Sequence, residues 1–151
     1  MQSKEDVRFE GISAAEFRQR TGIELEAFLA LALPKAQEVR ENAYAPYSDF
    51  HVGAALLVED RQFFCGANVE NASYGVTLCA ERNAGGAAVS QGQRKFLALA
   101  VAGAPPCGLC RQFLSEFNAQ LPIVFTSGHG VVVTSLDRLL PTAFGPASLH
   151  S

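Results

Sequence analysis

The most constraining feature of this sequence is an unbroken apolar run, Val52–Val58. A strand with one solvated face alternates apolar and polar residues, whereas a strand that is covered on both faces reads as a continuous apolar run. The run therefore predicts an inner strand of a sheet that carries a layer on each face. Further apolar runs predict four more strands, at residues 63–69, 96–102, 122–125 and 131–133.

Helices are predicted between and around these strands. A capping box at residues 13–16 opens a short helix that Gly22 ends. The apolar stretch 25–33 also has helical character, but a proline inside a helix removes a hydrogen bond and collides with the preceding turn. We therefore predict a break at Pro34 and a second helix over residues 35–42. Other helices are predicted at residues 78–90, from residue 107, and from residue 135 to Pro141.

These elements predict an α/β fold. Helices between and around five strands are typical of a three-layer α/β/α architecture with a mixed sheet, because a hairpin is antiparallel and a helical crossover joins parallel strands. The 151 residues are enough for one core. We expect a single domain that spans residues 1–151.

Charge and composition limit the class of partner. The net charge of −3 and the pI near 5.6 provide no basic surface for a phosphate backbone, so we expect no nucleic-acid partner and favour a small molecule. The charged start of the chain is followed by no apolar run of secretory or membrane-spanning length. We expect a cytoplasmic protein without a membrane partner, in which four cysteines are metal ligands or core residues rather than disulfides.

Two short motifs bring three thiols to predicted helix starts. Cys79 lies in residues 77–82, with Thr77 as the candidate N-cap, and Cys107 and Cys110 lie in residues 106–111. Unpaired N–H groups and the positive end of the helix dipole favour thiolates at such places. Structural zinc takes four protein ligands, whereas catalytic zinc takes three. The motifs therefore predict one catalytic Zn²⁺ per chain, and a redox role for the Cys-x-x-Cys pair is the alternative.

Three charged residues next to these thiols are candidates for roles in the chemistry. Glu81 can lean over the open metal position and move protons as a general acid and base. Its alternative role is that of a first-turn acid that favours the helix dipole. Three thiolates around Zn²⁺ leave a net charge of −1, and Arg82 and Arg111 are candidates to donate hydrogen bonds to the sulfurs from a second shell.

The fourth cysteine, Cys65, leaves a non-enzymatic alternative open. If Cys65 completed the ligand set, the site would be a closed structural zinc site in a binding module. Cys65 lies in an apolar strand run, where free cysteine is commonly a small core residue. The open site is therefore favoured.

Beyond these motifs, four blocks in order give a family resemblance. Residues 43–55, 66–74, 79–82 and 106–112 make the chain resemble the small zinc-dependent cytidine deaminases of the three-cysteine, homotetrameric type, over about residues 43–144. The resemblance implies hydrolytic deamination of cytidine and deoxycytidine to uridine and deoxyuridine, a step of pyrimidine salvage. A zinc-bound hydroxide would attack C4 of the base, with Glu81 as the proton shuttle.

The same resemblance implies roles for five further residues. Asn68 and Glu70 would hold the ribose, and Phe50 would pack beside the base. The carbonyl of Ala80 would meet the amine, and Phe144 would reach a neighbouring subunit of a homotetramer. From the residues alone, Asn68 and Glu70 also suit a hydrogen-bonded turn, and both phenylalanines also suit a core.

Two features depart from the family pattern. Residues 1–33 form an N-terminal extension, predicted to be helical, that is longer than these enzymes usually carry. Leu109 stands where a small residue is more common, which predicts altered packing near the metal. An alternative within the enzyme class is a deaminase of another aminated heterocycle, such as a nucleoside antibiotic, although the Asn-x-Glu pattern at residues 68–70 favours a ribose.

Overall fold

The sheet is mixed and has one more strand than the sequence predicts. A computed structural model describes residues 6–128 and 130–150, so the first five residues of the expected extension lie outside the described ranges. Within these ranges six strands form one sheet in the order β1-β6-β5-β4-β2-β3. Its pairs β1–β6 and β4–β5 are parallel and the other three are antiparallel. The strands are β1 (Asp6–Phe9), β2 (Gly53–Val58), β3 (Phe63–Ala67), β4 (Phe96–Ala102), β5 (Pro122–Ser127) and β6 (Gly130–Ser135).

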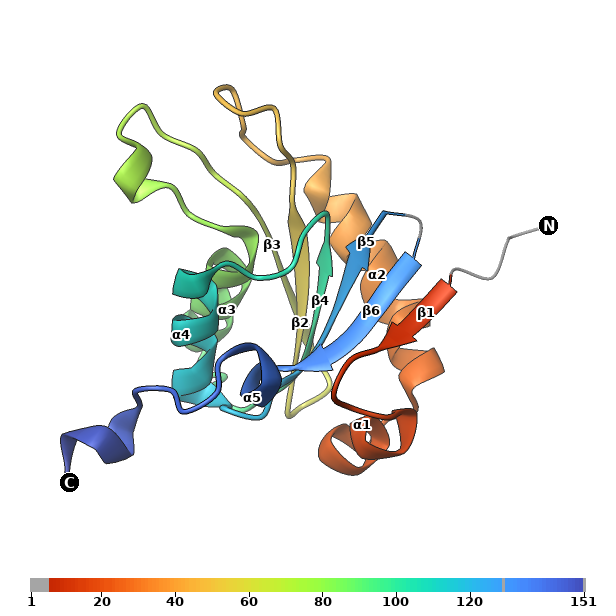
Figure 1. Cartoon of the computed structure of the whole chain (residues 1–151). Coiled ribbons are helices and arrows are strands. Elements are labelled where there is room, and N and C mark those ends of the chain that lie inside the picture. The colour runs from red at the N-terminus through yellow and green to blue at the C-terminus, as the bar shows by residue number, and fades with distance from the viewer. Residues whose placement is uncertain (1–5, 129, 151) are drawn as a thin grey trace.

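Helices cover both faces of this sheet and confirm the three-layer architecture (Figure 1). The helices α1 (Ala14–Thr21) and α2 (Leu25–Arg40) pack on one face. On the other face lie α3 (Ala80–Ser90), α4 (Gly108–Phe117) and the short α5 (Leu136–Leu139). Two 3₁₀ helices, η1 (Tyr74–Val76) and η2 (Pro146–Leu149), lie outside these layers. Among the described residues, no helix combines the length and the apolar character needed to cross a bilayer.

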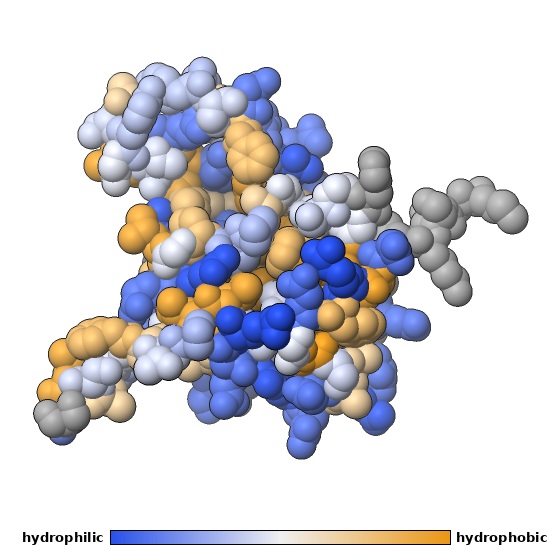
Figure 2. Space-filling view, viewed as in Figure 1, coloured by the Kyte–Doolittle hydropathy of each residue, from blue (hydrophilic) through white to orange (hydrophobic). Residues whose placement is uncertain are grey.

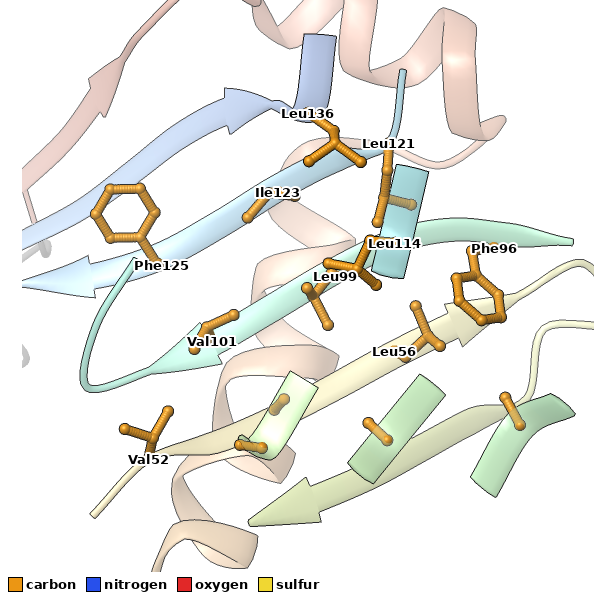
Figure 3. Close-up of a cluster of buried hydrophobic side chains, with 14 of the residues drawn as sticks. Val52, Leu56, Phe96, Leu99, Val101, Leu114, Leu121, Ile123, Phe125 and Leu136 are labelled. Atoms are coloured by element: carbon orange, nitrogen blue, oxygen red, sulfur yellow. The ribbon is translucent and has the colours of Figure 1, made fainter. Parts of the chain in front are cut away.

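The core consists of two apolar clusters, one on each side of the sheet. Leu56, Leu99 and Ile123 point toward α3, α4 and α5, with no exposed surface (Figure 3). Leu57, the next residue along β2, points to the cluster under α1 and α2. Every residue of β2 is buried, which confirms the inner strand predicted from the apolar run. Each fully buried Leu or Ile stabilises the fold by about 1.5–3 kcal/mol.

The additional strand β1 corrects the prediction of five strands. It is short, pairs with β6 along one edge of the sheet, and carries two charged residues. Its side chains are mostly exposed, and Phe9 is 49% exposed. An edge strand that faces solvent has no apolar run by which to be recognised. The expected helical extension therefore contains a strand, and its boundary at residue 33 falls inside α2.

Helix α2 also corrects the predicted break at Pro34. It is continuous from Leu25 to Arg40, with the proline inside. Pro34 lies on the exposed side of the helix, whereas Leu33 and Ala36 are buried against the sheet from either side of it in sequence. A proline inside a helix costs about 3 kcal/mol, and burial of the apolar face on both sides of Pro34 offsets that loss.

The topology brings the starts of two helices to the same end of the sheet, where β3 and β4 finish. Strands β3 and β4 both pair antiparallel with β2, which lies between them, so they point the same way. Helix α3 follows β3 and helix α4 follows β4, and both helices pack on the same face. The carboxyl ends of such strands are where open α/β sheets bind their ligands. The two cysteine motifs therefore meet at this end of the sheet.

Candidate active site

Three sulfur atoms converge where α3 and α4 begin. Cys79 is the N-cap of α3, Cys107 is the N-cap of α4, and Cys110 lies in the first turn of α4. Their Sγ atoms all lie within 4.8 Å of one another, and those of Cys79 and Cys107 are 3.6 Å apart. Two sulfurs bound to tetrahedral zinc lie about 3.8 Å apart. The donor set and its spacing fit zinc, and a third sulfur from a separate helix favours a metal over a two-thiol redox pair.

Helix α3 begins two residues later than predicted. We expected Thr77 to be the N-cap, but the cap is Cys79. The reason is the preceding segment, in which Leu78 exchanges two backbone hydrogen bonds with Val69, at 2.8 and 2.9 Å. That pairing keeps the backbone extended as far as the cysteine. As a result a cysteine, and not a threonine, is the N-cap residue of α3.

The three thiols are electrostatically unequal. Interaction with the neighbouring Cys110 thiol, aided by Arg82 and Cys107, lowers the pKa of Cys79 to about 5. The same interaction, together with burial, raises the pKa of Cys110. Cys79 is therefore the first of this pair to ionise. Zinc would displace the remaining protons, because it binds thiolates.

The two arginines beside the motifs make different contacts. Arg82 donates from Nη2 to the sulfur of Cys79 at 3.6 Å and to the carbonyl of Thr77 at 3.1 Å. Arg111 instead donates to two backbone carbonyls, those of Pro106 at 2.8 Å and Leu139 at 3.0 Å. Only Arg82 therefore neutralises thiolate charge directly. The expectation of a sulfur contact for Arg111 is wrong, because its guanidinium is turned toward α5.

Glu81 is buried beside the sulfurs. It lies in the first turn of α3, two residues after Cys79, and is 4% exposed. Burial raises the pKa of its carboxyl, although an interaction with Cys110 opposes this rise. A solvated first-turn acid that only favours the helix dipole would not be buried in this way. Its burial argues against that alternative, and its role in proton transfer stays a prediction.

Cys65 is remote from this cluster. It lies on β3 opposite Ala55, whose side chain belongs to the cluster under α2, while its neighbour Gly66 faces α3. Alternation along a strand therefore puts Cys65 on the face away from the three sulfurs. The structure contradicts both the closed zinc site and the core position expected for Cys65, which is exposed.

Asn68 and Glu70 organise the loop that precedes β2. The amide of Asn68 accepts from the N–H of Val52 and donates to the carbonyl of Phe50, both at 2.8 Å. Glu70 accepts the N–H groups of Tyr47 and Ser48 at 3.0 and 3.2 Å, and the Ser48 hydroxyl at 2.5 Å. These contacts give both residues the turn-forming role that their sequence position also suited. Their contact with a ribose stays a prediction.

The remaining candidates differ in exposure. Phe50 is 50% exposed and Phe144 is 62% exposed, so neither is a core aromatic. Ala80 is fully buried, with its carbonyl oxygen against Gly66, and its contact with a substrate amine stays a prediction. Leu109 is 67% exposed, so the predicted change in packing is not seen in this chain.

Two residues that contact candidate site residues were assigned no role from the sequence. The Ser48 hydroxyl donates to Glu70 and accepts from the N–H of Phe50 at 3.0 Å. The Gln112 amide donates to the carbonyl of Phe144 at 2.9 Å and so fixes the start of the C-terminal segment. Both lie within the sequence blocks that carry the resemblance. The Ser48–Glu70 and Gln112–Phe144 pairs are separated by 22 and 32 residues, and local patterns do not reveal pairs of that separation.

Comparisons with known proteins agree with this geometry. Residues 26–126 match the family model described as the cytidine and deoxycytidylate deaminase zinc-binding region. A cytidine deaminase of Sporosarcina psychrophila is 45% identical over 124 residues, which cover 78% of this chain and 91% of the relative.

Two crystal structures of cytidine deaminases resemble the fold. That from Burkholderia pseudomallei has a TM-score of 0.71 at 45% identity and covers 81% of this chain and 100% of its own. That from Mycobacterium tuberculosis has a TM-score of 0.69 at 40% identity, and the match covers 77% of this chain and 96% of the other. With its three convergent sulfurs, the chain belongs to the family of zinc-binding cytidine and deoxycytidylate deaminases.

Proposed function

We propose that this chain is a zinc-dependent hydrolase that deaminates cytidine and deoxycytidine, releasing ammonia and leaving uridine and deoxyuridine. The observation that carries the proposal is the convergence of three sulfurs beside the buried Glu81, in a chain of this family. Three protein ligands are the number that catalytic zinc sites use. The relatives named cytidine deaminase support the substrate.

Cys79, Cys107 and Cys110 would hold the zinc ion. When bound, zinc supplies Lewis-acid chemistry, which makes a water molecule acidic enough to act as a nucleophile near neutral pH. The positive ends of α3 and α4 and the guanidinium of Arg82 stabilise the negative charge of the thiolates. This stabilisation matters because a ligand set with excess negative charge would make a water molecule on the zinc ion less acidic.

Glu81 is the proposed proton shuttle. Its raised pKa, caused by burial, means that the carboxyl exchanges protons more readily near neutral pH than an exposed glutamate does. It would accept one proton from the attacking water and pass it to N3 of the pyrimidine. It would then carry the second proton of that water, released from the new hydroxyl on C4, to the leaving amine. The balanced reaction consumes one water and releases one ammonia per nucleoside.

Hydrogen-bonding capacity near Asn68 and Glu70 supports ribose binding. Glu70 accepts two hydrogen bonds at Oε1 and one at Oε2, so a carboxylate oxygen is left with capacity for a hydroxyl donor. Asn68 uses one amide hydrogen and one lone pair and keeps one of each. Both residues would therefore bind the sugar with the groups that the loop leaves free, and Phe50 would lie beside the base.

We further propose a homotetramer that acts in cytoplasmic pyrimidine salvage. Apolar residues are exposed on the C-terminal segment, which ends at the lower left of Figure 2. Within this segment Phe144 and Leu149 are 62% and 71% exposed. A neighbouring copy would cover this surface, and Phe144 would contribute to that copy's pocket. The four free cysteines suit a reducing compartment.

Ammonia release from cytidine tests the proposed function. At equal zinc content, Glu81→Gln should lower kcat by about 10²- to 10⁴-fold, because the amide cannot shuttle a proton. The zinc content should stay near one ion per chain, because Glu81 is not one of the three sulfur ligands. Arg18→Ala, an exposed change on α1, is the control. A Glu81→Gln protein as active as the wild type would refute the shuttle, and a wild type inactive on cytidine and deoxycytidine would refute the substrate.

A further inference from the structure

The short helix α5 is bound on one side by Arg111, the residue after the third zinc ligand. The guanidinium of Arg111 donates through Nη1 to the carbonyl of Leu139, the last residue of α5, and through Nε to the carbonyl of Pro106. Pro106 directly precedes Cys107. One side chain thus joins the end of α5 to the segment that sets the position of a zinc ligand.

The N-terminal segment, defined here as β1, α1 and the turn between them, binds α5 from the other side. Arg20 of α1 donates through Nη1 to Asp137 of α5 and to the carbonyl of Gln120, both at 3.0 Å. The side chain of Arg20 is only 24% exposed. Gly11, with φ of 82°, lies so close to Arg138 of α5 that an added Cβ would approach Arg138 Cδ to 2.3 Å. The two contacts are independent, and both reach α5.

Helix α5 is placed to transmit such contacts. It has four residues, too few to be stable as an isolated helix. Its only fully buried side chain is Leu136, whose N–H donates to the carbonyl of Leu121 at 2.8 Å. Its position therefore depends on the neighbours that hold it, and Arg20 and Arg111 are two of them.

We infer that the N-terminal segment is a positioning element for the zinc site, which acts through α5 and Arg111 on Cys107. The family model begins at residue 26, after this segment. Arg20 would hold α5 in place, α5 would hold the guanidinium of Arg111, and Arg111 would hold the backbone before Cys107. The inference rests on zinc binding by the three thiols, which is part of the proposed function, but it does not depend on the substrate.

Zinc affinity, measured on the full-length zinc-loaded protein by competition with a chromophoric chelator, tests this inference. Arg111→Ala should weaken zinc binding about tenfold, as loss of an outer-shell contact does. Arg20→Ala should weaken it about threefold, because Arg20 acts at a greater distance. The matched control is Arg18→Ala on the same helix, whose ion pair with Glu24 is exposed on both sides. It should leave zinc affinity unchanged.

The double variant separates positioning from general destabilisation. If Arg20 acts through Arg111, Arg20→Ala should weaken zinc binding no further once Arg111→Ala is present. Arg20→Lys keeps the charge and should restore part of the affinity. Should Arg20→Ala fail to fold, Asp137→Ala removes the acceptor on α5 and leaves Arg20 its hydrogen bond to the Gln120 carbonyl, and it should weaken zinc binding in the same direction.

Two results would overturn the inference. One is an Arg20→Ala or Asp137→Ala protein that melts earlier but binds zinc like the wild type. The other is a double variant whose loss equals the product of the two single losses. Neither measurement uses cytidine, so the test of this inference stays valid even if the proposed substrate is wrong.

Discussion

At the scale of single residues, Glu70 shows how one carboxylate fixes a loop. The Ser48 hydroxyl and the N–H groups of Tyr47 and Ser48 hold the pKa of Glu70 below its ordinary value of 4.5. A group whose pKa is lower in the folded state stabilises that state above its unfolded pKa. It loses the contribution as the pH falls through the folded pKa. The Glu70 contribution is therefore present at neutral pH and is lost in acid.

The lowered pKa of Glu70 predicts how the stability of Glu70→Gln compares with that of the wild type as the pH changes. In urea unfolding at pH 7, the wild type should be more stable than Glu70→Gln. That difference should shrink as the pH is lowered from about 5 to about 3, because the wild-type carboxylate becomes protonated. Zinc loss in acid affects both proteins and largely cancels in the comparison. A difference that stays constant or widens on acidification would contradict the assignment.

Residues with a local chemical pattern were the most predictable. The spacing of Cys79, Cys107 and Cys110 was sufficient to predict a three-thiol site, because both motifs lie at helix starts. The hydrogen bond from Arg111 to the carbonyl of Leu139 was not predictable, because Leu139 lies 28 residues further along the chain. The position of Cys65 depends on strand register, which the apolar run around it does not specify.

At the scale of elements, Gly66 controls how closely α3 approaches β3. A Cβ at Gly66 would lie 2.5 Å from the Ala84 nitrogen and 2.6 Å from the Ala80 oxygen, both backbone atoms of α3. Helix α3 begins at the Cys79 cap and carries Glu81, so any displacement of α3 moves part of the site. The glycine is therefore required by proximity rather than by an unusual backbone angle.

Gly66→Ala should destabilise the protein by about 1–3 kcal/mol, the usual range for overpacking, and should also weaken zinc binding. Gly86→Ala is the matched control, because Gly86 lies inside α3 with nothing within 4 Å of an added Cβ. It should stabilise the protein by about 0.4–1 kcal/mol. Thermal or urea unfolding and chelator competition provide the measurements. Equal effects of the two substitutions would show that proximity to β3 is unimportant.

The elements that were predicted share a strong local signal. Continuous apolar runs identified the inner strands β2 and β4, and the motifs placed the starts of α3 and α4 to within two residues. Strand β1 was missed because an exposed edge strand has no such run. The break at Pro34 was wrong because local propensity favoured it, whereas burial of both halves of α2 against the sheet decided the outcome.

At the scale of the whole molecule, two loops extend beyond the sheet. They span residues 41–52 and 68–79 and rise together at the top of Figure 1. Tyr47 and Tyr74 join them through an edge contact with ring centroids 5.7 Å apart. Tyr74 is nevertheless 74% exposed, and Phe144, which precedes η2, is 62% exposed. The proposed homotetramer would cover exposed apolar side chains such as Phe144.

The proposed homotetramer predicts a mass about four times the 16.1 kDa of one chain in sedimentation equilibrium. Phe144→Ser should shift the population to smaller species, because each buried Phe contributes about 1.5–3 kcal/mol. Phe144→Leu keeps an apolar side chain and should preserve the assembly. Circular dichroism should show an unchanged monomer fold, since Phe144 is exposed in the single chain. An unaltered mass for Phe144→Ser would exclude Phe144 from the contact.

The two helix starts that supply the sulfurs belong to separate parts of the chain, 28 residues apart. A metal ion bound by all three sulfurs would cross-link α3 and α4, so the free energy of metal binding would add to the stability of the folded state. Metal supply and protein lifetime are then linked. A chain without zinc should therefore open more often where α3 and α4 begin, and it should be more susceptible to proteolysis.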